Sequence, residues 1–224
     1  MCGIVGAATR RNVVGILLEG LQRLEYRGYD SAGLVLTDAN GSFKRVRRVG
    51  KVAALKVACQ RGSETDPGLG QTGIAHTRWA THGKPTENNA HPHVSSDQVA
   101  VVHNGIIENH NDLRVELEKA GYVFSSETDT EVVAHLVHRE VKLAGNFRPG
   151  VVAALGLLRG AYGVGVVHTN YPGMIVVARV GSPLVIGCGI GENFIASDPQ
   201  ALRPVTDRFI YLEEGEIAEV TADS

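Results

Sequence analysis

Cys2 is the residue of this sequence whose chemistry depends most on its position. It follows Met1 directly, and removal of that methionine would leave a thiol and a free α-amine on one residue. A thiol is a nucleophile, and an α-amine with a pKa of about 7.7 to 8.0 can accept its proton near neutral pH. The position also suits a small buried residue at the start of a strand. Other residues must decide between these two interpretations.

Asn104 and Gly105 are candidates for stabilising the negative charge that such a nucleophile would create. A thiolate that attacks an amide carbonyl needs hydrogen-bond donors aimed at the developing oxyanion. The Asn104 side chain can donate, and Gly105 lets a backbone N–H approach without a Cβ in the way. The same dipeptide also fits a simple turn, so both interpretations stay open on these two residues alone.

Arg78 and Asp129 carry opposite charges that would suit the two ends of an α-amino acid. Arg78 can hold a carboxylate through two parallel hydrogen bonds, and the loop around it also contains Trp79, Thr81 and His82. Asp129 can bind an ammonium group, although an acid in the first turn of a helix is favourable in its own right.

The elements expected around these residues place them at strand and helix ends. Apolar strands expected over residues 72–79 and 98–103 run directly into the polar loops, and a helix over 129–144 begins with a capping box formed by Thr128 and Glu131. The other expected elements are a helix capped by Asn12, helices over 51–60, 111–120 and 148–158, and strands over 3–8, 31–37, 42–49, 162–168, 174–180, 184–188, 193–197, 208–212 and 216–220.

The order of these elements predicts the fold class. Strands come first, then helices, then strands again, whereas a doubly wound parallel sheet needs the two to alternate. No internal repeat or flexible linker divides the chain. We therefore expect a single α+β domain in which helices cover antiparallel sheets.

Composition and charge argue against some classes of binding partner. The 224 residues are 43% hydrophobic, and 22 Lys and Arg against 24 Asp and Glu give a formal charge of −2. No global field attracts nucleic acid or an anionic membrane, and no apolar run approaches the roughly 18 residues of a membrane helix. Three cysteines suit a reducing, cytoplasmic setting, with Cys59 and Cys188 expected in the core. Nucleic acid, membranes and cofactors are therefore not expected partners.

Six blocks, in order, carry a resemblance to a known family. They are MCGIVG at 1–6, YRGYDSAG at 26–33, HTRWATHG at 76–83, HPH at 91–93, HNGIIEN at 103–109 and SETDTE at 126–131. Together they resemble the class II glutamine amidotransferases, and most of all the glutaminase domains of the enzymes that make glucosamine 6-phosphate. The resemblance covers nearly the whole chain and implies a glutaminase domain over residues 2–221.

The resemblance implies a fold and a set of roles. The fold is that of the N-terminal nucleophile hydrolases, with two stacked antiparallel sheets between helix layers in an αββα order. Cys2 would be nucleophile and base, and Asn104 with Gly105 would form the oxyanion hole. The remaining implied roles are glutamine binding by Arg78, Thr81, His82, Gly105 and Asp129, and support by Arg27, Trp79 and His91, with Trp79 on a loop that closes over glutamine.

The implied reaction releases ammonia from glutamine through a γ-glutamyl thioester that water then hydrolyses. In the full enzymes of this kind, ammonia passes to a C-terminal sugar isomerase domain that converts fructose 6-phosphate to glucosamine 6-phosphate. We expect that domain to be absent from this chain, and the full-length protein to be a homo-oligomer.

Other interpretations stay open at this point. The glutaminase domain of a phosphoribosyl-pyrophosphate amidotransferase or of an asparagine synthetase is the nearest alternative, and a non-catalytic glutamine sensor is another. Clustered histidines raise the question of a metal hydrolase, but His91-Pro92-His93 is not by itself a binding site and no HExxH-type spacing accompanies it.

Overall fold

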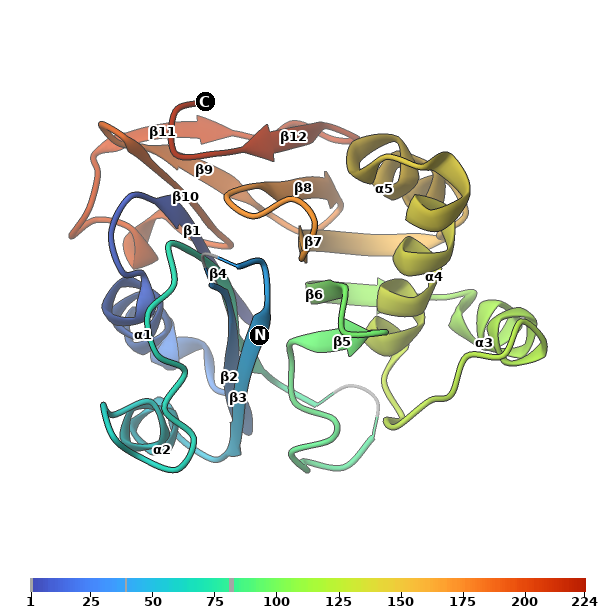
Figure 1. The fold of residues 1–224 in the computed structure, drawn as a ribbon, viewed down its shortest axis with the longest axis horizontal. Coiled ribbons are helices and arrows are strands. Elements are labelled where there is room, and N and C mark those ends of the chain that lie inside the picture. Colours follow the sequence, from blue (N-terminus) through green and yellow to red (C-terminus); the bar gives the residue numbers. More distant parts are fainter. Residues whose placement is uncertain (1, 39, 81–82) are drawn as a thin grey trace.

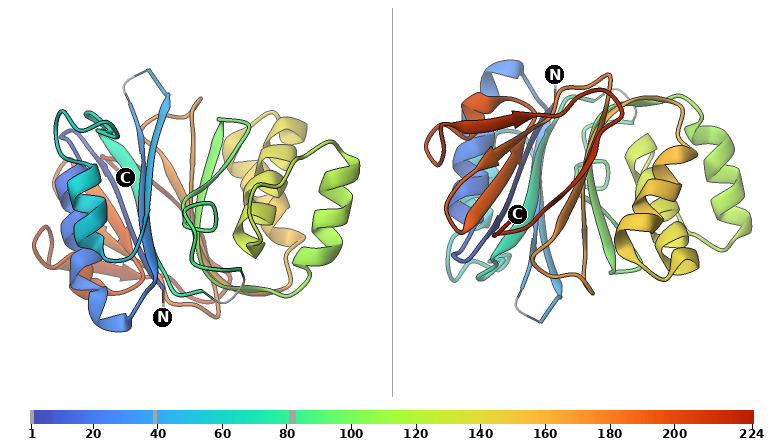
Figure 2. Two further views of the ribbon diagram at one scale, coloured as in Figure 1. Left: turned by 90° about the horizontal axis from the view of Figure 1, so that it is seen from below. Right: turned by 90° about the horizontal axis from the view of Figure 1, so that it is seen from above.

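The structure, a computed structural model, describes residues 2–38, 40–80 and 83–224. It has four layers, with two antiparallel sheets packed face to face and helices on each outer face (Figures 1 and 2). This arrangement confirms the predicted α+β class and the αββα order.

The first sheet has seven strands in the order β11-β9-β10-β1-β4-β2-β3, and its neighbours pair antiparallel. Its central strand β1 is buried along its whole length, because the apolar residues and small glycines and alanines of the segment let both faces pack closely. The strands are β1 (Gly3–Thr9), β2 (Ser31–Thr37), β3 (Phe43–Val49), β4 (Thr72–Arg78), β9 (Val185–Cys188), β10 (Glu192–Ala196) and β11 (Arg208–Tyr211).

The second sheet has five strands in the order β12-β8-β7-β6-β5, again antiparallel. The short strand β5 was not predicted, and β6 is longer than the predicted strand over 98–103 because it continues through Asn104 and Gly105. The strands are β5 (His93–Ser95), β6 (Val99–Ile107), β7 (Gly160–His168), β8 (Ile175–Val180) and β12 (Ile217–Val220).

In the part of the chain that the structure describes, five α-helices form the outer layers. Helices α1 and α2 cover the seven-stranded sheet, whereas α4 and α5 cover the five-stranded sheet and α3 packs beside α4 (Figures 1 and 2). The bounds are α1 (Val14–Arg23), α2 (Val52–Ala58), α3 (His110–Lys119), α4 (Asp129–Ala144) and α5 (Phe147–Gly156), with short 3₁₀ turns at Glu25–Arg27 and Pro199–Ala201. No helix in the described ranges is long and apolar enough to cross a membrane.

The caps of two helices differ from prediction. Val13, not Asn12, is the N-cap residue of α1, and the Asn12 Oδ1 accepts instead from the Gly70 amide at 3.3 Å and the Val14 amide at 3.5 Å. At α4, the Thr128 hydroxyl accepts from the Glu131 amide at 3.3 Å, as predicted. The Glu131 carboxylate, however, accepts from serines that precede the cap. The predicted second hydrogen bond of the capping box, from the Thr128 backbone amide to this carboxylate, is therefore wrong.

Three apolar clusters match the layers. One lies between α1, α2 and the seven-stranded sheet, one between the two sheets, and one between the five-stranded sheet and α3, α4 and α5. Cys59 is buried in the first cluster, as predicted, but Cys188 is only half-buried at the edge of the central one. The packed central layer fixes how the ends of β1 and β4 face the end of β6.

Candidate active site

Cys2 lies immediately before β1, and the pairing of that strand brings it to the end of β4. Gly3 stands opposite Thr77 in the ladder, so Cys2 is next to Arg78 and Trp79. The Trp79 amide donates to the Cys2 Sγ at 3.2 Å. Burial raises the pKa of the Cys2 thiol, and the Trp79 amide opposes that shift without cancelling it. The resting group is therefore a protonated thiol that needs a base.

Asn104 and Gly105 approach Cys2 from the other sheet. The Asn104 Nδ2 donates to the Cys2 carbonyl oxygen at 3.2 Å. Both residues lie inside β6, where Gly105 pairs with Tyr162, so the alternative of a simple turn is wrong. Gly105 has φ of 127°, and a Cβ there would lie 2.0 Å from the Ala161 carbonyl oxygen. Only glycine fits this position.

Arg78 ends β4 with its side chain buried. Its guanidinium donates to the carbonyl oxygens of Gly83 at 3.2 Å and Lys84 at 3.4 Å, and lies 3.7 Å from Asp30 Oδ1. Asp30 also accepts from the Ala80 amide at 2.5 Å. The predicted binding residues Thr81 and His82 lie outside the described residues.

Asp129 begins α4 and is 4% exposed. Its Oδ2 accepts from the Ile107 amide at 2.9 Å, which ties the start of α4 to the end of β6. It is also an acid in the first turn of a helix, as weighed from sequence, and its role toward an ammonium group stays a prediction.

A small cavity of about 20 Å³ brings these groups together. This is room for about one water molecule. It is lined by Cys2, Arg78, Trp79, His91, His103, Gly105, Thr128, Asp129 and Thr130. A wider hollow of about 400 Å³ lies against the same thiol, and is lined by Cys2, Arg27, Trp79, Asn104, Gly105, Ile106, Ser182 and Pro183. The thiol thus lies between a small cavity and a wider, mostly apolar hollow.

The residues predicted to support the site also lie close to it. The Arg27 guanidinium donates to the Cys2 carbonyl oxygen at 3.4 Å and pairs with Asp198 at 2.8 Å. His91 is buried, lines the small cavity and stacks on His76 with ring centroids 4.1 Å apart. Trp79 is 53% exposed and covers Gly28, where a Cβ would lie 2.6 Å from the indole.

Sequence reasoning missed several residues that hold these groups in place. Asp30 lies inside one of the six blocks, which was a usable signal, whereas Asp198 lies outside them, shortly after β10. Asn89 gave none: its amide donates to the Lys84 carbonyl at 2.9 Å and to the Glu127 carboxylate at 3.0 Å, and the second contact joins positions 38 residues apart. These bonds join the loop after Arg78 to the segment before Asp129.

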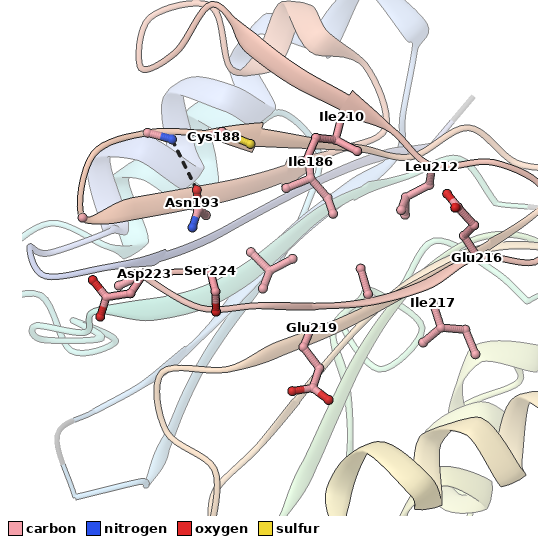
Figure 3. A pocket seen from close by; sticks show the side chains of 15 residues that line it. Ile186, Cys188, Asn193, Ile210, Leu212, Glu216, Ile217, Glu219, Asp223 and Ser224 are labelled. Carbon is pink, nitrogen blue, oxygen red and sulfur yellow. Dashed lines mark hydrogen bonds between the residues drawn. The ribbon is translucent and has the colours of Figure 1, made fainter.

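A larger hollow lies elsewhere. Its volume is about 600 Å³, and Figure 3 shows Ile186, Ile210 and Leu212 on one side with Ile217 and Glu219 on the other. Strands β9, β11 and β12 line it, together with the last residues of the chain. None of the predicted site residues that the structure describes lines this hollow, so size does not identify the site.

The fold and the site together define a class of protein. A cysteine before the central strand of one sheet meets a carboxamide and a glycine from the other, beside an arginine and an aspartate. The chain belongs to the glutamine amidotransferase domain family, which it matches over residues 76–204.

Curated relatives narrow the comparison. The chain is 61% identical over 224 residues to the glutamine–fructose-6-phosphate aminotransferase (isomerizing) of Pseudomonas aeruginosa, covering 100% of this chain and 36% of that protein. Its counterpart in Escherichia coli K12 is 62% identical over 224 residues, with the same two coverages. The chain therefore spans about a third of the length of these relatives.

Solved structures agree with the fold. The glutamine phosphoribosylpyrophosphate amidotransferase of B. subtilis, complexed with ADP and GMP, superposes with a TM-score of 0.80 at 27% identity, over 98% of this chain and 47% of that one. A glutamine aminotransferase class-II domain protein from Silicibacter pomeroyi shares the fold, with a TM-score of 0.62 at 16% identity over 99% of this chain and 95% of that one.

Proposed function

We propose that this chain hydrolyses L-glutamine to glutamate and ammonia, with Cys2 as the nucleophile after removal of Met1. The observation that carries the proposal is that Cys2, Arg78 and Asp129 line one small cavity, while the Asn104 amide donates to the Cys2 carbonyl oxygen. Family membership supports the same reaction. Residues 2–221 form the glutaminase domain in this proposal.

The first step forms a thioester. The α-amine of Cys2 takes the thiol proton, sulfur attacks the amide carbon of the glutamine side chain, and the carbonyl oxygen becomes an oxyanion. One hydrogen of Asn104 Nδ2 is used by the Cys2 carbonyl, so the second hydrogen and the Gly105 amide stabilise that oxyanion. The α-ammonium returns the proton to the leaving nitrogen, the C–N bond breaks, and ammonia leaves.

The second step regenerates the thiol. Water gives a proton to the α-amine and adds to the thioester carbon, and the C–S bond then breaks to release glutamate. The amine returns the proton to sulfur, so no group is consumed. Because burial raises the pKa of the thiol, an adjacent base is needed to form the thiolate near neutral pH.

Arg78 and Asp129 orient the substrate in this scheme. The guanidinium pairs with the α-carboxylate and Asp129, with the Gly105 carbonyl, meets the α-ammonium. Thr81 and His82 stay predicted contacts of the carboxylate. The 20 Å³ cavity is too small for glutamine, so the loop that contains Trp79 must shift to admit it.

We extend the proposal to the longer protein. The relatives at about 60% identity are named for transfer to fructose 6-phosphate, and this chain matches 36% of their length. Ammonia would leave through the 400 Å³ hollow beside Trp79 toward a sugar isomerase domain and convert fructose 6-phosphate to glucosamine 6-phosphate. A homo-oligomeric full-length protein belongs to the same proposal.

Ammonia and glutamate release by the purified 224-residue chain tests the reaction, with intact mass to establish whether Met1 is present. We expect equal amounts of both products from protein that begins at Cys2. Cys2→Ala should reduce turnover at least 10³-fold because it removes the nucleophile. Cys188→Ala, which changes another half-buried thiol, should keep it.

Protein that begins at Cys2 and binds glutamine without releasing either product would overturn the proposal. That result would favour the glutamine-sensor alternative.

A further inference from the structure

His76 lies behind the candidate oxyanion hole rather than in it. It is on β4, is fully buried, and its Nε2 lies 3.0 Å from two oxygens, the His103 carbonyl and the Asn104 Oδ1. None of the roles derived above uses this ring.

The His103 carbonyl fixes the tautomer of His76. A carbonyl oxygen can only accept a hydrogen bond, so the Nε2 that faces it must carry hydrogen. Burial lowers the pKa of His76 to about 3, which leaves the ring neutral with a single proton near neutral pH. That proton is on Nε2, and Nδ1 has no hydrogen-bond partner among the described residues.

The tautomer in turn fixes the orientation of the Asn104 carboxamide. The end of the amide that faces an N–H donor must be its oxygen, which puts Nδ2 on the side of Cys2. The Cys2 carbonyl favours the same orientation, because it accepts from Nδ2 at 3.2 Å. A flipped amide would set N–H against N–H at His76 and oxygen against oxygen at Cys2.

The ring itself is held by packing. His91 stacks on it with an interplanar angle of 30°, and His93 packs edge-on against His91 with centroids 5.0 Å apart. In the sheet, His76 pairs with Ile4 on one side and Gly33 on the other. Its Cα therefore cannot shift unless the neighbouring strands shift with it.

We propose that His76 is a positioning residue for the oxyanion hole: it fixes the Asn104 amide so that Nδ2 faces the reacting carbon. This rests on the proposed glutaminase function and deepens it. Without the His76 donor, the amide is free to flip, and the fraction of protein with a correctly placed donor falls.

The test compares three substitutions in the 224-residue chain, with ammonia release as the assay. His76→Phe keeps a flat ring and removes the donor, and we expect kcat for glutamine to fall about tenfold to a hundredfold, less than the 10²- to 10³-fold typical of losing an oxyanion donor outright. His76→Gln can place an amide N–H near the Nε2 position and should recover kcat to within a few-fold. His76→Asn has the same chemistry without the reach and should resemble Phe, with KM little changed in all three.

A double-mutant cycle separates positioning from general damage. In an Asn104→Ala background there is no amide to orient, so His76→Phe should have little further effect on kcat, whereas a structural defect would lower kcat by the same factor again. Alkylation of Cys2 by iodoacetamide should stay close to the wild-type rate in every His76 variant, because attack on a saturated carbon forms no oxyanion. His135→Phe, which removes another buried histidine in α4, is the matched control and should keep kcat.

Several outcomes contradict the proposal. Wild-type kcat in His76→Phe, equal losses in the Gln and Asn variants, or an undiminished effect in the Asn104→Ala background would each exclude a positioning role. If His76→Phe does not fold, the Gln and Asn pair still decides. An inactive wild-type protein that begins at Cys2 would instead mean that the proposed function fails.

Discussion

At the residue scale, the Asp129 side chain combines an observed structural contact with a proposed contact to substrate. One carboxylate oxygen accepts from the Ile107 amide at 2.9 Å, and the residue also lines the cavity that contains Cys2. The contact with Ile107 needs only an oxygen, whereas recognition of an ammonium group needs a negative charge. Substitution by asparagine therefore separates the two contributions.

Asp129→Asn should lower kcat/KM for glutamine by about tenfold to a hundredfold, mainly through KM. A charge-assisted hydrogen bond is roughly twice as strong as a neutral one, and the lost partner leaves the substrate ammonium buried and unpaired. The amide oxygen can still accept from Ile107, so the thermal midpoint should change little. Steady-state kinetics and a thermal melt measure both effects.

A substrate without the α-amine provides the control for this prediction. The analogue is glutaramic acid, which keeps the carboxylate and the side-chain amide of glutamine. Its kcat/KM should be nearly equal in wild type and Asp129→Asn. An equal loss for both substrates would mean that Asp129 acts through the fold and not through the ammonium group.

The sequence was enough to name the residues proposed to face the substrate, but not the residues that hold them in place. Cys2, Asn104 and Asp129 are in blocks whose residue types suit the chemistry, and the structure places them together. Asn89 and His76 act through contacts that depend on strand register and on a loop bond between positions 38 residues apart. Local sequence does not contain that information.

At the element scale, the start of α4 is stabilised differently from the predicted capping box. The Thr128 cap is as predicted, but the Glu131 carboxylate accepts from the backbone amides of Ser125 and Ser126 at 2.9 and 2.7 Å, and from both hydroxyls. Burial alone would raise the pKa of Glu131, and these hydrogen bonds outweigh burial and hold it below its ordinary value. The helix start that positions Asp129 thus depends on an ionised, buried acid.

Glu131→Gln should destabilise the protein by about 1–3 kcal/mol at pH 7, because the amide NH₂ would face donors in the serine segment. The pH dependence follows from the lowered pKa. A carboxyl group whose folded pKa lies below its unfolded value of about 4.3 contributes stability above that value, and the contribution is lost as pH falls through the folded pKa. Urea unfolding at pH 7 and near pH 4 should therefore show a smaller difference between variant and wild type at the lower pH.

Glu118→Gln is the matched control for this substitution. Glu118 is an exposed acid on the neighbouring helix α3, and its replacement should change stability by less than about 0.5 kcal/mol at either pH. A deficit for Glu131→Gln that is as large near pH 4 as at pH 7 would contradict the ionised-acid explanation.

The ends of elements were harder to predict than their existence. Strand β6 continues through Gly105 because that residue adopts a conformation closed to other residues, with φ of 127°. The dipeptide Asn104-Gly105 looks like a turn from its sequence alone. Its pairing with β7, more than fifty residues away along the chain, makes it part of a strand instead.

At the scale of the whole molecule, the candidate site exists only because the two sheets are packed together. Cys2 and Arg78 come from the seven-stranded sheet, whereas Asn104 and Gly105 come from the five-stranded one. The order of elements along the chain was enough to predict antiparallel sheets covered by helices, and the family resemblance implied that there are two. It did not predict the order of strands within them, since β1 pairs with β10 at the other end of the chain.

Ile195 tests how the packing of the two sheets relates to activity. It is fully buried on β10, and its side chain fits beside two glycines: a Cβ on Gly6 would lie 2.6 Å from it, and one on Gly165 of the opposite sheet 3.0 Å from it. Ile195→Ala should lower the free energy of unfolding by about 2–5 kcal/mol, and Ile195→Val by about 0.5–1.5 kcal/mol. Urea unfolding measures both, and Val123→Ala at an exposed position is the control.

The same titrations show whether the site survives in part of the molecule. Trp79 is the single tryptophan, and it lies beside Cys2, so its fluorescence reports the site while far-ultraviolet circular dichroism reports the sheets. If each sheet supplies only half of the chemistry, glutamine hydrolysis, fluorescence and circular dichroism should all be lost at one urea midpoint. That midpoint should be lower in Ile195→Ala, and kcat of the variant should be unchanged at urea concentrations below the transition. Activity that persists after the circular dichroism of the sheets is lost would show that one sheet suffices. Activity and fluorescence lost together, well before the circular dichroism, would show that the loop at Trp79, and not the contact between the sheets, is the weakest part of the site.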